Sequence, residues 1–167
     1  MNVIIILATG RKGRQSEKVA DFVFEKTDFK SEIIDVRDWV KPVTEKYPED
    51  QEELRQKFEQ ADGFIIVSPE YNSSYPGELK ILLDTFLKEY EGKPVGIVGV
   101  SAGSFGGIRM IEKLRPVLIN LGLVPISKMV TFKDVRSVFK DGELVKDSYN
   151  QYVDEFLNKL KEKVKSS

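Results

Sequence analysis

Five short apolar runs, most of them rich in β-branched residues, recur along the chain at intervals of about 30 residues, the length of a βαβ unit. The segments between these runs carry apolar residues at helical spacing. This alternation predicts an α/β fold with a doubly wound parallel sheet, right-handed crossovers and helices on both faces. The expected strands are residues 3–8, 31–36, 64–68, 95–100 and 124–130.

The helical pattern is clearest after Pro76, a residue that suits the first turn of a helix. One apolar stripe there comprises Leu79, Leu82, Leu83, Phe86, Leu87 and Tyr90. In the next helical segment, Pro116 is expected to kink or restart the helix. A last amphipathic helix is expected over about 149–164, after a tight turn at 140–143. No linker, repeat or low-complexity run divides residues 1–167, so we expect a single domain.

The composition excludes several classes of catalytic site. The chain has no cysteine and no histidine, which rules out disulfides, thiolate or imidazole metal sites, cysteine nucleophiles and Ser-His-Asp triads. Any catalysis must rest on carboxylates, lysines, tyrosines or a cofactor. The net charge of -1 gives no reason to expect nucleic acid or an anionic membrane as a partner. The run 3–8 is too short to span a bilayer and has no basic leader, which favours the cytoplasm.

Ligands of such sheets bind outside the carboxyl ends of the strands, so the loops after strands one, three and four matter most. The first loop, 9–16, contains two glycines, the cations Arg11, Lys12 and Arg14, and the hydroxyl of Ser16 before a helix. Backbone N–H groups, hydroxyls and cations at a helix N-terminus suit a phosphate. The loop matches neither the dinucleotide fingerprint nor a nucleotide triphosphatase loop. Taken alone, it could equally be a solvated basic turn.

The other two loops suit a planar ring. Residues 68–77 include two tyrosines, two prolines and a glycine, so this loop can offer backbone N–H groups and a flat apolar surface. Residues 101–109 include three glycines and two serines, and Phe105 could cover an apolar face. Each loop alone could be an ordinary turn or a flexible connection. Because all three loops are expected at one edge of the sheet, a shared ligand with a phosphate and a ring is the better explanation.

Two of these segments resemble the NADPH-dependent FMN reductase family, which includes small azo-dye, quinone and chromate reductases. Residues 68–80 are similar to the family's Pro-Glu-Tyr-Asn…Pro-Gly-x-Leu-Lys segment, and 99–109 to its Ser/Gly-rich loop before an arginine-bearing helix. The resemblance extends to about residue 130 and implies a flavodoxin-like, doubly wound, five-stranded parallel sheet. The first loop matches least, because many members have Gly-Ser-x-Arg where this chain has Thr9-Gly10-Arg11-Lys12. Which of Arg11, Lys12 and Arg14 meets the phosphate therefore stays open.

Carried over position by position, the resemblance implies an FMN site built from all three loops. The FMN phosphate would meet Thr9, Arg11, Gln15 and Ser16. The flavin ring would lie against Pro69, Glu70, Tyr71 and Asn72. Its pyrimidine side would be closed by Ser101, Gly103, Gly106 and Gly107. Backbone N–H groups of 69–72 and 101–107 would stabilise charge on the reduced ring, and we assign no catalytic side chain.

The resemblance also implies an activity. NADPH or NADH would donate electrons to bound FMN, which would pass them to a quinone, azo compound, metal ion or free flavin. Arg109 and Lys12 are candidate partners for the 2′-phosphate of NADPH, and a homodimer or homotetramer is expected. The main alternative is a flavodoxin-type electron carrier without enzymatic activity, which the near-neutral charge and basic first loop disfavour. A regulatory domain without a ligand is the third interpretation.

Overall fold

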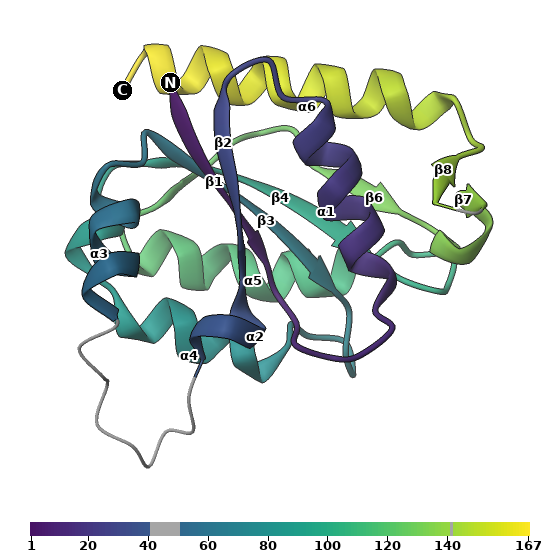
Figure 1. Cartoon of the computed structure of the whole chain (residues 1–167), viewed down its shortest axis with the longest axis horizontal. Helices are drawn as coiled ribbons and strands as arrows, with labels where there is room; N and C mark the ends of the chain where they lie inside the picture. Colours follow the sequence, from purple (N-terminus) through teal and green to yellow (C-terminus); the bar gives the residue numbers. More distant parts are fainter. Residues whose placement is uncertain (41–50, 141) are drawn as a thin grey trace.

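The computed structural model describes residues 1–40, 51–140 and 142–167. A parallel sheet crosses the molecule in the order β2-β1-β3-β4-β5 (Figure 1). Both β5 and β6 pair with β4, β5 at its beginning and β6 at its end. The strands are β1 (Asn2–Leu7), β2 (Lys30–Asp35), β3 (Gly63–Pro69), β4 (Pro94–Val100), β5 (Val124–Pro125) and β6 (Val130–Phe132). The strand order reverses direction beside β1, as in a doubly wound sheet. The predicted fold class is confirmed.

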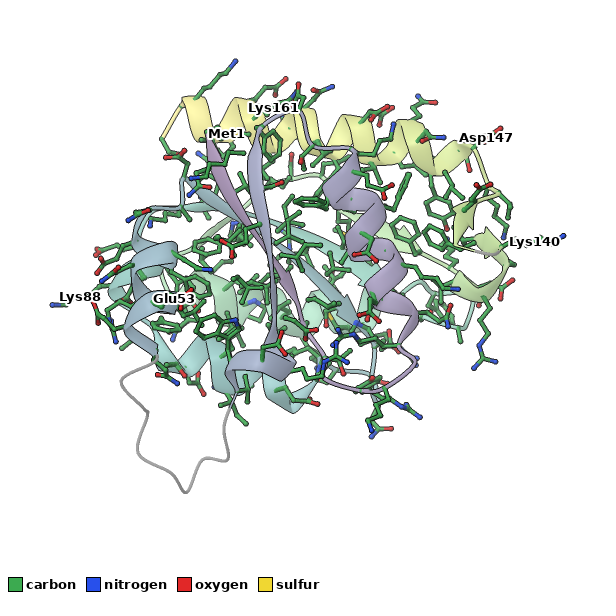
Figure 2. All side chains as sticks on the ribbon, in the orientation of Figure 1. Met1, Glu53, Lys88, Lys140, Asp147 and Lys161 are labelled. Carbon is green, nitrogen blue, oxygen red and sulfur yellow. The ribbon has the colours of Figure 1, made fainter. Side chains whose placement is uncertain are left out.

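Helices cover both faces of the sheet, and each face has its own apolar core. The helices are α1 (Gln15–Glu25), α2 (Val36–Trp39), α3 (Gln51–Glu59), α4 (Gly77–Thr85), α5 (Ile108–Asn120) and α6 (Ser148–Lys165), with 3-10 turns η1 (Lys88–Tyr90) and η2 (Val135–Ser137). Alternate residues of β1 enter opposite cores: Ile4 packs with α3, α4 and α5, whereas Ile5 packs with α1 and α6. Side chains fill both layers, while Lys88 and Lys140 point away from the body (Figure 2). This two-sided burial explains the nearly continuous apolar strands.

The fifth strand differs from its prediction, because 124–130 does not form one strand. β5 pairs with the beginning of β4 at Pro94 and Val95, and β6 pairs with its end at 98–100. The N–H groups of Val124 and Ile126 donate to the carbonyl oxygens of Lys93 and Val95 (2.9 Å each), so the ladder passes Pro125, but residues 127–129 form no strand. The chain rejoins the sheet at β6, and residues 131–137 therefore reach the carboxyl edge where the candidate site lies.

Two helix predictions also need correction. α4 ends at Thr85, and Leu87 is 61% exposed although it continued the predicted apolar stripe. The Leu87 N–H donates instead to the carboxylate of Glu89 (3.0 Å), which satisfies this donor outside a helix. α5 runs from Ile108 to Asn120 with Pro116 inside it, so the proline does not restart the helix, and the alternative of a kink at Pro116 stays a prediction.

The C-terminal segment agrees with its prediction. α6 spans Ser148–Lys165 and packs on β4, where Phe156 lies directly against Gly96 and leaves no room for a Cβ atom. Before it, β7 (Phe139–Lys140) and β8 (Glu143–Leu144) form an antiparallel pair around the predicted turn. Residue 141 of that turn lies outside the described residues. No helix in the described part of the chain is long and apolar enough to cross a membrane.

Candidate functional site

The loops after β1, β3 and β4 meet at the carboxyl edge of the sheet, as the sequence predicted, and enclose two adjoining cavities. The larger cavity, of about 360 Å³, is lined by residues 11–16, 69–71, 100–102 and 135–136. The smaller cavity, of about 310 Å³, is lined by residues 70, 72–73, 101–103, 105 and 109. Glu70, Ser101 and Ala102 line both cavities. A further hollow of about 460 Å³ lies between β5 and the end of α6, and no residue of the three loops lines it.

Thr9 ties the first loop to the loop after β3. Its side chain is fully buried, and its Oγ1 atom lies 3.1 Å from the hydroxyl oxygen of Tyr71. The backbone N–H of Arg11 donates to the same Oγ1 atom (3.4 Å). Thr9 does not line either cavity. It therefore positions Tyr71 and the turn of the first loop, and its predicted contact with a phosphate stays a prediction.

Ser16 lies in the first turn of α1, on the wall of the larger cavity. Its side chain is 1% exposed, and its hydroxyl has no hydrogen-bond partner among the residues that the structure describes. The N-cap residue Arg14 provides no side-chain hydrogen bond to the helix end, so the first N–H groups of α1 lack a side-chain cap. A buried hydroxyl without a partner beside an uncapped helix N-terminus is typical of an anion site. Gln15 lines the same wall.

Arg14 has a different role from the other two cations of the loop. Its side chain is only 2% exposed, and its guanidinium donates to both carboxylate oxygens of Asp35, to Glu17 (3.2 Å) and to the carbonyl oxygen of Thr9. Burial opposes its charge, but the bonds to Asp35 and Glu17 outweigh burial and raise the pKa of Arg14. Arg14 therefore fastens the first loop to the end of β2. Its charge is neutralised there, which leaves Arg11 and Lys12 for a phosphate.

Arg11 and Lys12 are exposed and line the larger cavity. The guanidinium carbon of Arg11 lies 5.9 Å from the centre of the Tyr71 ring. No ion pair joins either side chain to a carboxylate in the part of the chain that the structure describes. Both cations can therefore turn toward an anion at the N-terminus of α1.

The loop after β3 contains a two-residue turn in the left-handed region. Tyr71 and Ser74 exchange two backbone hydrogen bonds, of 2.8 and 2.9 Å, across Asn72 (φ 50°) and Ser73 (φ 63°). This is the geometry of a type I′ turn, in which asparagine is favoured. The Glu70 N–H donates to the carbonyl oxygen of Val100 (3.0 Å). The N–H groups of Glu70 and Tyr71 are thus used within the protein, and of 70–72 only that of Asn72 has no acceptor among the described residues.

The Glu70 side chain joins the loop after β3 to the first turn of α5. It is 6% exposed, and its Oε1 atom accepts from Nε of Arg109 (2.7 Å) and from a second guanidinium nitrogen. The guanidinium of Arg109 also lies over the ring of Phe105, at 5.6 Å. The other carboxylate oxygen of Glu70 is buried and has no hydrogen-bond partner in the described part of the chain. Arg109 is therefore held by Glu70, and a buried acceptor remains between the two cavities.

The glycines of the loop after β4 differ in position: Gly103 lines a cavity, whereas Gly106 and Gly107 pack against the sheet. Ser101 and Gly103 line the smaller cavity, where the Ser101 hydroxyl interacts with the backbone of Gly103. Gly106 (φ 62°) and Gly107 (φ 86°) line neither cavity and pack against the sheet. A Cβ atom at Gly107 would lie 2.9 Å from the Val100 nitrogen. These two glycines allow the loop to approach β4, and their predicted flavin contact stays a prediction.

Arg136 and Val135 line the larger cavity and were not predicted as site residues. They belong to η2, which follows β6. The rule that ligands bind beyond the carboxyl ends of parallel strands would have indicated this segment. The sequence prediction missed it because the fifth strand was placed at 124–130 rather than at the later pairing of β6 with β4.

Comparison with known proteins identifies the family to which these loops belong. Residues 1–137 match the family described as NADPH-dependent FMN reductase. The chain belongs to this family. The match confirms the family that the sequence resemblance indicated.

Two curated relatives are about a third identical to this chain over the residues that align. A 2-hydroxy-1,4-benzoquinone reductase from Burkholderia sp is 32% identical over 120 residues, which cover 68% of this chain and 66% of that protein. An NAD(P)H-dependent FMN reductase from Pseudomonas aeruginosa is 32% identical over 120 residues, covering 68% and 65%. The chain thus spans slightly less than two thirds of each of these relatives.

Solved structures show the same fold. The flavoenzyme NAD(P)H:(acceptor) oxidoreductase FerB from Paracoccus denitrificans superimposes with a TM-score of 0.80 at 22% identity, covering 96% of this chain and 97% of that one. A flavodoxin from Pseudomonas aeruginosa gives 0.63 at 17% identity, with 96% and 99% covered. These similarities establish the flavodoxin-like architecture.

Proposed function

We propose that this reductase-family protein binds FMN and transfers electrons from NADPH or NADH, through the flavin, to a small acceptor such as a quinone. The observation that carries the proposal is the buried Ser16 hydroxyl, which lies at the N-terminus of α1 and has no hydrogen-bond partner within residues 1–40, 51–140 and 142–167. Ser16 lines the larger cavity, which the loops after β3 and β4 also line. A single phosphate site beside a polar and aromatic cleft suits a mononucleotide better than a dinucleotide.

The residues of the first loop would hold the phosphate. Ser16 supplies a hydroxyl, α1 supplies N–H groups at its positive end, and Arg11 supplies a charged donor. Arg14 contributes indirectly, because its bonds to Asp35 and to the Thr9 carbonyl hold the loop in this conformation. The available groups therefore fit a phosphate dianion.

The residues of the other two loops would hold the ring. Pro69 and Tyr71 line one side of the larger cavity, and Ser101 and Ala102 line the junction of both cavities. The unpartnered oxygen of Glu70 at this junction can accept a hydrogen bond from an N–H group. FMN, when bound, would supply hydride acceptance and two-electron transfer. The side chains would bind, orient and shield the ring, and none is needed as a nucleophile.

The names of the relatives indicate a class of electron acceptor. Relatives are named as reductases of quinones and of FMN, which favours a quinone over an azo compound or metal ion as the first acceptor to test. A homodimer or homotetramer and a cytoplasmic location stay predictions. The flavodoxin-type carrier is the competing proposal, and it predicts a bound flavin that NADPH alone does not reduce.

Cofactor identity and kinetics test the proposal together. Cofactor released by heat should run as FMN, at one per chain, because the phosphate site lacks the dinucleotide fingerprint. Initial rates with NADPH and benzoquinone should give parallel double-reciprocal lines, since donor and acceptor would use the same cleft in turn. Released FAD, or intersecting lines from a ternary complex, would count against this account.

A further inference from the structure

Arg136 is a cation of the larger cavity that has no part in the FMN contacts proposed above. It is exposed, and it lines this cavity together with Arg11 and Lys12. The other arginines at this edge are engaged, because Arg14 is paired with Asp35 and Arg109 with Glu70. No ion pair joins Arg136 to a carboxylate in residues 1–40, 51–140 or 142–167.

The backbone holds Arg136 in a defined position. Asp134 (φ 43°) turns the chain sharply, and its N–H donates to the carbonyl oxygen of Gly103 (3.0 Å). The Val135 N–H donates to the carbonyl oxygen of Ser101 (3.0 Å). The segment before Arg136 is thus fastened to the loop that lines both cavities, so the side chain starts from a fixed point on the cavity rim.

Arg136 and the phosphate loop lie on opposite sides of the cleft. The phosphate loop follows β1 and Arg136 follows β6, with β3 and β4 between them in the sheet. Three strand spacings place these two strands about 14 Å apart. A phosphate bound at the N-terminus of α1 lies on the β1 side. Arg136 is therefore positioned for a second anion that shares the cleft with FMN.

We propose that Arg136 binds the 2′-phosphate of NADPH and makes the enzyme prefer NADPH to NADH. The inference rests on the proposed function, since it assumes that a nicotinamide dinucleotide enters this cleft. The sequence offered Arg109 and Lys12 for that phosphate; the Arg109 guanidinium is held by Glu70, and Lys12 belongs to the loop that would hold the FMN phosphate. A planar guanidinium binds a phosphate dianion through paired, charge-assisted hydrogen bonds.

The test compares Arg136→Gln with the wild-type holoprotein. Dissociation constants for NADP⁺, NAD⁺ and adenosine 2′,5′-bisphosphate are measured by calorimetry, and kcat/KM is measured with NADPH and NADH. The variant should bind NADP⁺ and the bisphosphate roughly 10-fold more weakly, since Arg136 is exposed and its bonds fall at the low end of the range for charged groups. NAD⁺ binding and FMN content should not change, and the NADPH/NADH ratio of kcat/KM should fall by about the same factor.

Lys146→Gln is the matched control. Lys146 donates to the Ser137 hydroxyl (2.6 Å), so its charge lies beside η2, but it does not line the cavity. The Lys146→Gln variant should behave as wild type. Arg136→Lys should retain part of the preference for NADPH that Arg136→Gln loses. Equal weakening of NADP⁺ and NAD⁺, no effect on either, or loss of FMN would overturn the inference. If the wild-type protein contains no FMN, the proposed function fails instead, so the two failures can be told apart.

Discussion

Arg11, Lys12 and Arg14 are equivalent cations in the sequence, and the fold makes them different. Arg14 is buried and bonded to Asp35 and Glu17, whereas Arg11 and Lys12 are exposed at the cavity. Burial of a guanidinium requires charged partners, and these partners come from β2 and α1. The loop composition indicated a phosphate site, but it could not show that Arg14 is the cation that holds the loop in place.

The first prediction concerns the Arg14–Asp35 pair. Asp35→Asn should lower the free energy of unfolding at pH 7 by about 3 kcal/mol, because it leaves Arg14 buried with Glu17 as its remaining carboxylate. Desolvation raises the pKa of Asp35, but hydrogen bonds from Arg14 and Arg37 outweigh it and lower this pKa. The stabilisation is therefore complete above the unfolded pKa of about 3.9 and is lost as pH falls through the folded pKa.

Urea unfolding of the apoprotein at pH 7 and at acid pH measures this effect. Asp28→Asn is the matched control, since it removes an exposed carboxylate that pairs with Lys161, and it should change stability little. An Asp35→Asn variant as stable as wild type at pH 7, or a deficit that grows below pH 4, would refute the role assigned to the pair.

The second prediction concerns Arg11. Arg11→Ala should weaken FMN binding by about 10- to 150-fold, the equivalent of the roughly 1.5–3 kcal/mol of a hydrogen bond to a charged group. Riboflavin lacks the phosphate, so its affinity should change much less. Fluorescence titration of the apoprotein with both ligands measures the difference. Equal weakening of both, or of neither, would show that Arg11 is not the phosphate partner, and Lys12→Ala would then be tested in the same way.

At the scale of elements, the turn at Tyr71–Ser74 determines how Asn72 can be tested. Asn72 has φ 50°, where alanine is disfavoured by about 1–2 kcal/mol and glycine is not. The third prediction is that Asn72→Ala lowers apoprotein stability by about 1 kcal/mol, whereas Asn72→Gly does not.

Both Asn72 variants should lower FMN affinity or reductase rate, because both remove the side chain that lines the smaller cavity. Thermal unfolding of the apoprotein and flavin titration of each variant separate backbone strain from ligand contact. If Asn72→Gly binds flavin and turns over as well as wild type, the side chain contributes only to the turn.

Element boundaries were predicted less well than element types, and particular contacts explain why. The apolar stripe 79–90 suggested one long helix, but Glu89 accepts the Leu87 N–H and the chain leaves the helix after Thr85. The apolar run 124–130 suggested one strand, but residues 127–129 leave the ladder between β5 and β6. In both cases the residues are apolar because most of them are buried, and burial does not require one regular element.

At the scale of the whole molecule, strand order could be combined with one general rule to predict the position of the site. Parallel strands with right-handed crossovers bring their carboxyl ends together, so the loops after β1, β3 and β4 had to meet. The Glu70–Arg109 bond could not be predicted in this way, since it depends on side-chain packing between distant segments.

The absorption spectrum of the purified protein during anaerobic titration with NADPH tests the central claim most directly. We predict the visible band of an oxidised flavin, its loss on addition of NADPH without any other protein, and its return when benzoquinone is added. A flavin band that NADPH leaves unchanged would identify an electron carrier. A colourless protein that remains colourless after addition of FMN and removal of the excess would contradict the assignment of the cleft as a flavin site.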